Sequence, residues 1–110
     1  ALREFITRNG IDVVLSGHTH VPLVKRRMIR RTGTRTTFLD ARCGTTSQRS
    51  GGMYQWSRPL GRSCPNSVLI HRVERTGETY RWRTQTCYQS PQGFVLAERQ
   101  RDLTAYVEFK

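Results

Sequence analysis

The chain has 110 residues, which limits it to one domain at most. Its formal net charge is +11, and arginine supplies nearly all of the positive charge because Lys25 and Lys110 are the only lysines. This charge suits polyanionic partners, whether nucleic acid, an anionic membrane or a phosphorylated substrate, and it equally suits a solvated surface, which is the simpler interpretation.

The cysteines Cys43, Cys64 and Cys87 are odd in number and lack CxxC spacing. They argue against a disulfide framework and against a cysteine zinc site, and a cytoplasmic location is the simplest expectation. No apolar run approaches the length of a membrane span, and no signal-peptide pattern opens the chain, so we expect no membrane partner. The chain opens at Ala1 within a predicted helix, and we therefore expect a piece of a longer protein.

Residues 1–9 are predicted to form the end of an amphipathic helix whose apolar stripe is Leu2, Phe5 and Ile6. Gly10 suits the C-cap because it accepts left-handed backbone without steric cost. Ile11–Ser16 follow as a strand with consecutive apolar residues, which is typical of a strand covered on both faces. Helix, tight turn and buried strand in this order indicate a layered α/β arrangement.

Leu23–Arg31 and Arg35–Leu39 are predicted to form a hairpin around the turn Thr32-Gly33-Thr34. The basic residues of this hairpin indicate that one of its strands lies near a sheet edge. Residues 40–66 have no clean period and predict a long loop. Met53, Tyr54 and Trp56 in its middle would anchor the loop or cover a pocket.

Ser67–Arg75 and Glu78–Tyr88 are predicted to form an antiparallel pair around Thr76-Gly77. In the second strand Tyr80, Trp82, Thr84 and Thr86 share one face, which we expect to pack inward. The break at residues 90–93 leads to an ambiguous tail, in which Val95–Leu103 suit a short helix and Ala105–Phe109 a last strand.

Two histidines, His18 and His20, follow the first predicted strand directly and stand between Gly17 and Pro22. On extended backbone, positions i and i+2 point the same way, so both imidazoles can address one small volume. Imidazole is the commonest nitrogen ligand for Zn, Fe, Mn and Ni ions. Sites of layered α/β folds lie just beyond the carboxyl ends of strands, as this pair does. The pattern favours a metal site, although hydrogen bonding of both imidazoles at the surface remains the alternative.

The stretch "DVVLSGHTHVP", residues 12–22, resembles the Gly-His-x-His motif that closes the motif series of calcineurin-like metallophosphoesterases. More faintly, "TTFLDARCGTTSQR" resembles a strand and small-residue loop of that family, and "PNSVLIHRVERTGETYRW" its closing pair of strands. The resemblance implies an α/β fold of four layers, α/β/β/α, with a two-metal centre. Residues 1–110 would form its β-rich C-terminal part, an α+β fragment of a single domain. His18 and His20 would each bind one of two divalent or trivalent ions, either Mn, Fe, Zn or Ni.

Other motifs of that family are not in this sequence. Its Asp-x-His pair, Gly-Asp pair, Asn-His-Asp/Glu element and further histidine have no counterpart here, and Asp12 and Asp40 lack the corresponding setting. The implied activity of the whole protein is hydrolysis of phosphate mono- or diesters at the two ions. The family's leaving-group histidine belongs to an absent motif, so no catalytic residue is assigned here, and we expect residues 1–110 alone to be inactive.

His71, the third histidine, stands mid-strand and is expected to be a packed or surface residue. Asp40 is expected to cap the end of a strand, with a contact to His18 or His20 as the sharper alternative. A second hypothesis for the whole chain is a basic β-rich nucleic-acid-binding module, which would use arginines for phosphates and aromatic rings such as Tyr54, Trp56, Tyr80 and Trp82 for stacking. A third is a purely structural or interaction fragment.

Overall fold

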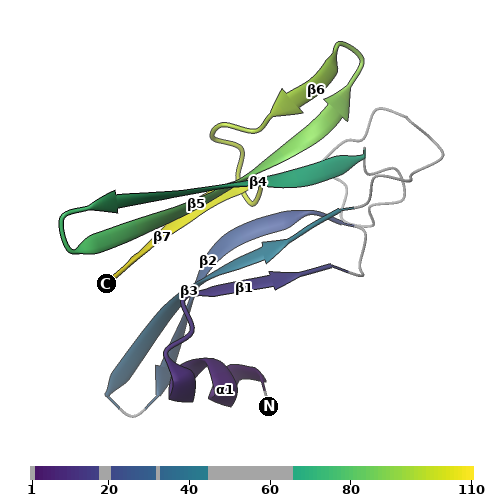
Figure 1. Cartoon of the computed structure of the whole chain (residues 1–110). Helices are drawn as coiled ribbons and strands as arrows, with labels where there is room; N and C mark the ends of the chain where they lie inside the picture. Colours follow the sequence, from purple (N-terminus) through teal and green to yellow (C-terminus); the bar gives the residue numbers. More distant parts are fainter. Residues whose placement is uncertain (1, 18–20, 32, 45–65) are drawn as a thin grey trace.

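The computed structural model describes residues 2–17, 21–31, 33–44 and 66–110. Within these ranges the elements are α1 (Leu2–Asn9), β1 (Val13–Ser16), β2 (Leu23–Arg31), β3 (Thr34–Arg42), β4 (Ser67–Thr76), β5 (Thr79–Ser90), β6 (Gly93–Leu96) and β7 (Thr104–Phe109) (Figure 1). Strands dominate and the helix precedes them, so the chain is a small β-rich α+β domain, as the sequence predicts at this level.

The end of α1 is fixed by Gly10, whose backbone is left-handed with a φ of 59°. The N–H of Ile11 then donates to the carbonyl of Ile6 over 3.1 Å, which is the bond of a Schellman cap. Ile6 is buried, and Ile11 packs against the same cluster. The predicted helix and cap are confirmed, but the predicted apolar stripe is not buried as a unit because Leu2 and Phe5 stay exposed.

The first sheet has the strand order β1-β3-β2, with β1 parallel and β2 antiparallel to β3. β2 and β3 form the predicted hairpin, and Gly33 adopts a φ of 78° in its turn. In the described part β2 is an edge strand, which fits the prediction from its basic residues. β3 runs on to Arg42 because Leu39–Arg42 pair with β1 on one side and β2 on the other. The prediction that a loop begins at residue 40 is therefore wrong.

The second sheet is built on β5, the longest of the described strands. β4 pairs with β5 along its whole length, as predicted, and Gly77 with a φ of 62° makes the turn. The other edge of β5 is shared: residues 80–85 pair with β7, and residues 87–90 pair with β6. Val95–Leu103 do not form the helix offered as one interpretation, because Gly93 with a φ of 111° reverses the chain and its next residues pair back onto β5.

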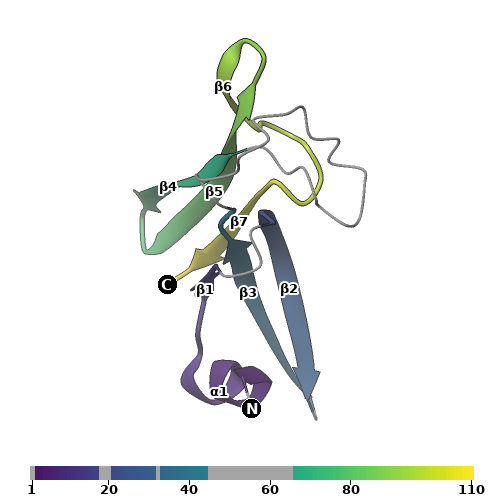
Figure 2. The same cartoon turned by 90° about the vertical axis from the view of Figure 1, so that its right-hand side faces the viewer.

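The layers follow the order α1, first sheet, second sheet (Figures 1 and 2). On the helix side Ile6 packs with Ile29 and Phe38. Between the sheets Val24, Leu39 and Val107 form a second buried cluster, to which Val13, Leu69, Trp82, Ala105 and Phe109 add partly buried side chains. The N–H of Val24 also donates to the carbonyl of Asp102 over 2.8 Å, which ties the sheets together through the backbone.

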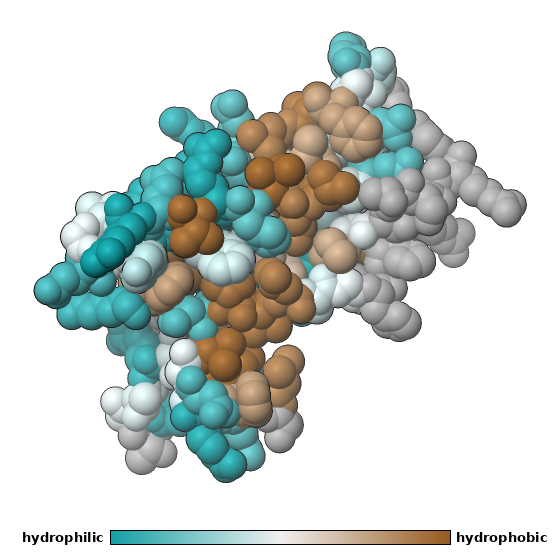
Figure 3. All heavy atoms as spheres, in the orientation of Figure 1, coloured by the Kyte–Doolittle hydropathy of each residue, from teal (hydrophilic) through white to brown (hydrophobic). Residues whose placement is uncertain are grey.

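One edge strand of each sheet, β1 of the first and β4 of the second, lies on the same side of the molecule. In the described ranges β1 pairs only with β3, and β4 only with β5, and both strands lie at the left of Figure 2. Val13 and Val14 of β1 are partly buried on opposite faces of the sheet, so the predicted cover on both faces holds for these two residues only. Leu15 nevertheless stays 53% exposed, and Ile70 of β4 is also exposed. Figure 3 shows apolar side chains gathered on this face.

Candidate functional site

The predicted metal motif begins at the carboxyl end of β1. This strand ends at Ser16, Gly17 follows it, and β2 begins two residues after Val21. His18 and His20 lie outside the described residues, so the structure provides the position of the flanking chain and not that of the two imidazoles. The predicted strand before the motif is confirmed. The remaining loop residues 45–65, with Tyr54 and Trp56, also lie outside the described part.

Gly17 is required for close packing rather than for an unusual backbone conformation. Its φ is not among the positive values found in the described residues. A Cβ at Gly17 would lie 3.1 Å from Sγ of Cys43, which is tighter than ordinary contact. The N–H of Cys43 donates to the carbonyl of Ser16 over 2.9 Å and holds β3 at this short distance. Gly44 is packed as closely, against Pro22 and the Ser67 hydroxyl.

A cavity of about 500 Å³ opens at this end of the first sheet. It is bounded by the last residues of β1 and β3 and the first of β4, namely Leu15, Ser16, Ala41, Cys43, Gly44, Ser67, Val68, Leu69 and His71. The side chain of Ser67 is buried, and its hydroxyl has no hydrogen-bond partner within the described structure. A buried hydroxyl without a partner is costly, so Ser67 is an unsatisfied polar group at the wall of the cavity, with its oxygen shielded from solvent. Nothing in the sequence pattern singled out Ser67.

His71 lines the same cavity, but its ring is already engaged by the second sheet. Its Nδ1 lies 2.8 Å from the hydroxyl of Thr84, and the indole N–H of Trp82 donates to the same nitrogen over 3.1 Å. The same indole N–H lies 3.2 Å from the Thr84 hydroxyl and is shared between the two acceptors; where Nδ1 accepts, the proton of the neutral ring is on Nε2. Burial lowers the pKa of His71 below its ordinary value of 6.5. His71 itself is exposed on β4 while its ring is engaged in these contacts, which fits the expectation of a packed or surface residue.

Asp40 does not cap a strand end, because it lies inside β3, and that expectation is wrong. Its carboxylate is nearly buried and accepts a hydrogen bond of 2.6 Å from Nε of Arg27. Arg42 donates to it from Nη2 over 3.1 Å and from Nε over 3.4 Å. A buried carboxylate requires such partners. Asp40 and Arg42 are two positions apart in β3, and Arg27 is paired with Phe38, two positions before Asp40. All three side chains therefore share one face of the hairpin, which the sequence could have indicated once the hairpin register was known.

Asp12 lies at the amino end of β1, five residues before Gly17 and thus at the opposite end of the strand. Its backbone carbonyl accepts from the N–H of Leu39 over 2.8 Å, and burial raises the pKa of its side chain above 3.8. Asp12, Asp40 and His71 are thus held in three separate places. Within the described ranges no group of three histidine, cysteine or acidic side chains could hold a metal ion.

The aromatic rings of β5 are packed within the fold. Tyr80 stacks on Phe109 at a centroid distance of 5.7 Å. Trp82 meets His71 edge to face at 5.5 Å. Both residues are partly buried by these contacts.

Comparison with known proteins gives no relative. No protein-family model matches the chain, and no curated protein and no solved structure shows significant similarity to it. Among the described residues, no helix has both the length and the apolar character needed to cross a membrane. Function therefore has to be inferred from the side chains and their geometry.

Proposed function

We propose that the chain is part of a metal-dependent phosphoesterase of the calcineurin-like type, in which His18 and His20 are metal ligands. The observation that carries this proposal is the setting of the motif. Gly17 leads out of the carboxyl end of β1 beside a cavity of about 500 Å³ that holds the unpartnered hydroxyl of Ser67. Ligand sites of layered α/β folds occupy this position.

The order of layers supports the same proposal. A helix, a mixed sheet and a second sheet are stacked in that order, with apolar clusters in both interfaces. This order agrees with three consecutive layers of the α/β/β/α sandwich that the motif implies. The free edges of β1 and β4, on the same side, would be where both sheets continue. The proposal therefore treats residues 1–110 as the C-terminal part of one larger domain.

His18 and His20 would supply only two of the ligands that a pair of transition-metal ions needs. Two neutral imidazoles suit Mn, Fe, Zn or Ni, but each ion needs further ligands. The described residues offer no ligand cluster, so the remaining carboxylates and histidines would come from outside residues 1–110. Two such ions, when bound, activate water at neutral pH and stabilise the charge that develops on a phosphate group.

The residues of this chain have defined tasks in that proposal. His18 and His20 supply neutral nitrogen ligands. Ser67 donates its hydroxyl to a phosphate oxygen, which would relieve its missing hydrogen bond. Gly17 and Gly44 keep the two chain segments at the cavity in close contact. The net charge of +11 attracts an anionic ester toward the site.

The test compares three single variants of the protein as its gene encodes it: His18→Ala, His20→Ala and, as the matched control, His71→Gln. Elemental analysis measures bound metal, and a chromogenic phosphate monoester and diester measure turnover. We expect both alanine variants to lose metal and most turnover, while His71→Gln keeps both. Full turnover with undiminished metal in either alanine variant would refute the assignment.

The nucleic-acid hypothesis makes a different prediction for the same proteins. It expects binding of a single-stranded oligonucleotide that needs no metal and weakens steeply with salt. The packed rings of Tyr80 and Trp82 speak against a stacking platform on β5. Tight oligonucleotide binding by a metal-free protein without esterase activity would favour this second function.

A further inference from the structure

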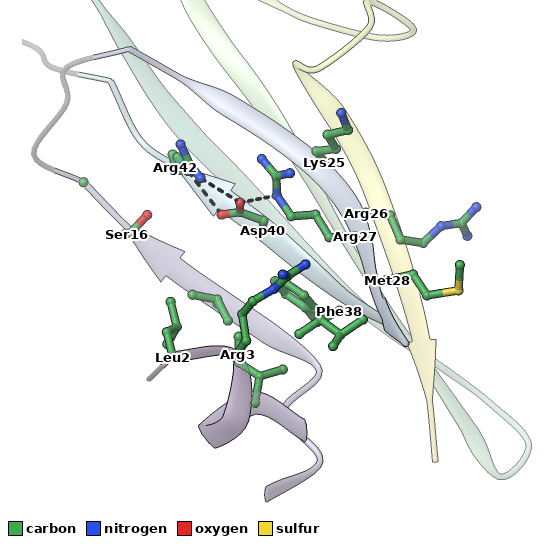
Figure 4. A pocket seen from close by; sticks show the side chains of 14 residues that line it. Leu2, Arg3, Ser16, Lys25, Arg26, Arg27, Met28, Phe38, Asp40 and Arg42 are labelled. Carbon is green, nitrogen blue, oxygen red and sulfur yellow. Dashed lines mark hydrogen bonds and ion pairs between the residues drawn. The ribbon is translucent and has the colours of Figure 1, made fainter. Parts of the chain in front are cut away.

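A second cavity, of about 660 Å³, lies on the helix side of the first sheet. Its walls include the apolar side chains of Leu2, Ile6 and Phe38. Its charged lining residues are Arg3, Lys25, Arg26, Arg27, Asp40 and Arg42 (Figure 4). The side chain of Arg26 points to the other side of β2 in Figure 4, whereas Arg3 rises from α1 toward the sheet.

The strand register explains why so many cations meet here. Lys25, Asp40 and Val14 occupy one row across the sheet, since Asp40 is paired with both neighbours. Arg42 is paired with Ser16 in the next row. Partners in a register share a face, and Val14 packs against the cluster under α1, so these rows face the helix side. The short helix covers Ile29 and Phe38 but leaves the charged rows open.

Asp40 holds two guanidinium groups in place at the floor of this cavity. Arg27 contacts Asp40 through Nε at 2.6 Å, and Arg42 contacts it through Nε and Nη2. These contacts use Nε of Arg27 and both Nε and Nη2 of Arg42. They leave Nη1 and Nη2 of Arg27 and Nη1 of Arg42 without an acceptor in the described structure. Both side chains are only 37% and 40% exposed, so they are partly desolvated and oriented rather than freely solvated.

The charges of this cluster do not balance. One carboxylate, Asp40, stands against the four cations Arg3, Lys25, Arg27 and Arg42. The single negative charge of Asp40 neutralises one of these cations, so the cluster keeps a net charge of about +3. Arginine forks fixed by a carboxylate match the oxygens of phosphate, which accept several charge-assisted hydrogen bonds at once.

We propose that this cavity is a binding site for the phosphate group of a small molecule. Arg27 and Arg42 bind its oxygens, Arg3 closes the site from α1, and Asp40 acts as a positioning residue for the two arginines. The site's charged residues lie on the helix side of the sheet, and only Ser16 borders both this cavity and the one at the carboxyl end of β1. It depends on neither His18 nor His20, and its failure would leave the proposed esterase function untouched.

Calorimetric titration with inorganic pyrophosphate, at constant ionic strength, tests the proposal. Arg27→Gln and Arg3→Gln should each weaken binding by about tenfold or more, because each removes a charge-assisted contact. Arg35→Gln is the matched control. Arg35 is exposed on the same sheet but outside the cavity, so its substitution removes the same charge without touching the site. Its effect should stay below about twofold. Arg3→Gln leaves the Asp40 cluster intact, so its result does not depend on the folding of a core variant.

Asp40→Asn separates a built site from simple charge attraction. The substitution raises the net charge by one, so general attraction predicts tighter binding of pyrophosphate. The proposed site predicts weaker binding, because Arg27 and Arg42 lose their anchor. Equal losses in Arg3→Gln, Arg27→Gln and Arg35→Gln would overturn the proposal. So would binding of an oligonucleotide without terminal phosphates in place of pyrophosphate.

Discussion

The indole N–H of Trp82 points at Nδ1 of His71 over 3.1 Å, and this contact favours the tautomer that carries its proton on Nε2. A protonated His71 would turn an N–H toward the N–H of Trp82, and the ring is also partly removed from water. Burial of the ring lowers its pKa below 6.5. The contacts with the second sheet and the partial burial of the ring therefore favour the neutral form of His71.

The first prediction is a loss of stability in mild acid that depends on His71. Well above pH 6.5 the imidazole is neutral in both the folded and the unfolded chain, and its contribution to stability is complete. As the pH falls from there through the lowered folded pKa, the unfolded chain takes up the proton first and the free energy of unfolding decreases. Urea denaturation across this range should show a shallower decrease in His71→Gln. An NMR titration of Trp82→Phe should show a raised His71 pKa, and an unchanged value would contradict the role of the indole.

The second prediction concerns the contact between Gly17 and Cys43. A Cβ at Gly17 would lie 3.1 Å from Sγ of Cys43, so Gly17→Ala should destabilise the fold by about 1 kcal/mol. In the double variant Gly17→Ala, Cys43→Ala the sulfur is gone, and much of this cost should vanish. A double-mutant cycle by chemical denaturation measures the coupling. Strictly additive effects would show that the two residues do not constrain one another.

Local patterns predicted most of the elements, and tertiary pairing decided the rest. Gly10, Gly33 and Gly77 lie in turns with positive φ, and the sequence located all three. The end of β3 was missed because Asp40 and Arg42 do not favour a strand by themselves. They are held there by two flanking strands, one of them distant in sequence. The tail was ambiguous for a similar reason, since β6 exists only as a partner of β5.

The candidate sites were predicted less completely than the fold. The strand before His18 and His20 was evident because apolar β-prone residues precede a glycine. The hydroxyl of Ser67 gave no signal, because its isolation depends on the packing of Gly44 against it. The pairing of Arg27 with Asp40 joins residues 13 positions apart, and only the hairpin register brings them together.

The third prediction tests how α1 is attached. Ile6 is 1% exposed under the helix, so Ile6→Ala should cost about 2–5 kcal/mol of unfolding free energy. Phe5→Ala removes a larger side chain that is 57% exposed and should change stability by less than about 0.5 kcal/mol. Equal destabilisation by both substitutions would mean that the exposed face of α1 is covered in solution.

The fourth prediction separates the two unpartnered hydroxyls of the second sheet. Ser67 and Thr86 are both buried without a hydrogen-bond partner in the described part, so Ser67→Ala and Thr86→Val should leave stability unchanged or raise it by about 1 kcal/mol. Only Ser67 lines the cavity at the end of β1. In the esterase assay Ser67→Ala should therefore raise KM for a phosphoester, while Thr86→Val should not. An effect of Thr86→Val as large as that of Ser67→Ala would argue against a contact between Ser67 and the substrate.

The last prediction concerns residues 1–110 expressed alone. β1 has an unpaired edge in the described part, and Leu15 on it is 53% exposed, which favours association between chains. We expect this chain to self-associate, to melt at nearly the same temperature with and without Mn²⁺ or Zn²⁺, and to lack esterase activity above background. Two histidines alone would bind an ion weakly, and weak binding adds little stability.

Sedimentation velocity should show less association for Leu15→Lys. Phe5→Lys is the control, because Phe5 is also exposed but lies on α1 and not on a sheet edge. A metal-dependent melt with measurable turnover would mean that residues 1–110 contain a complete metal site, against the ligand count given above.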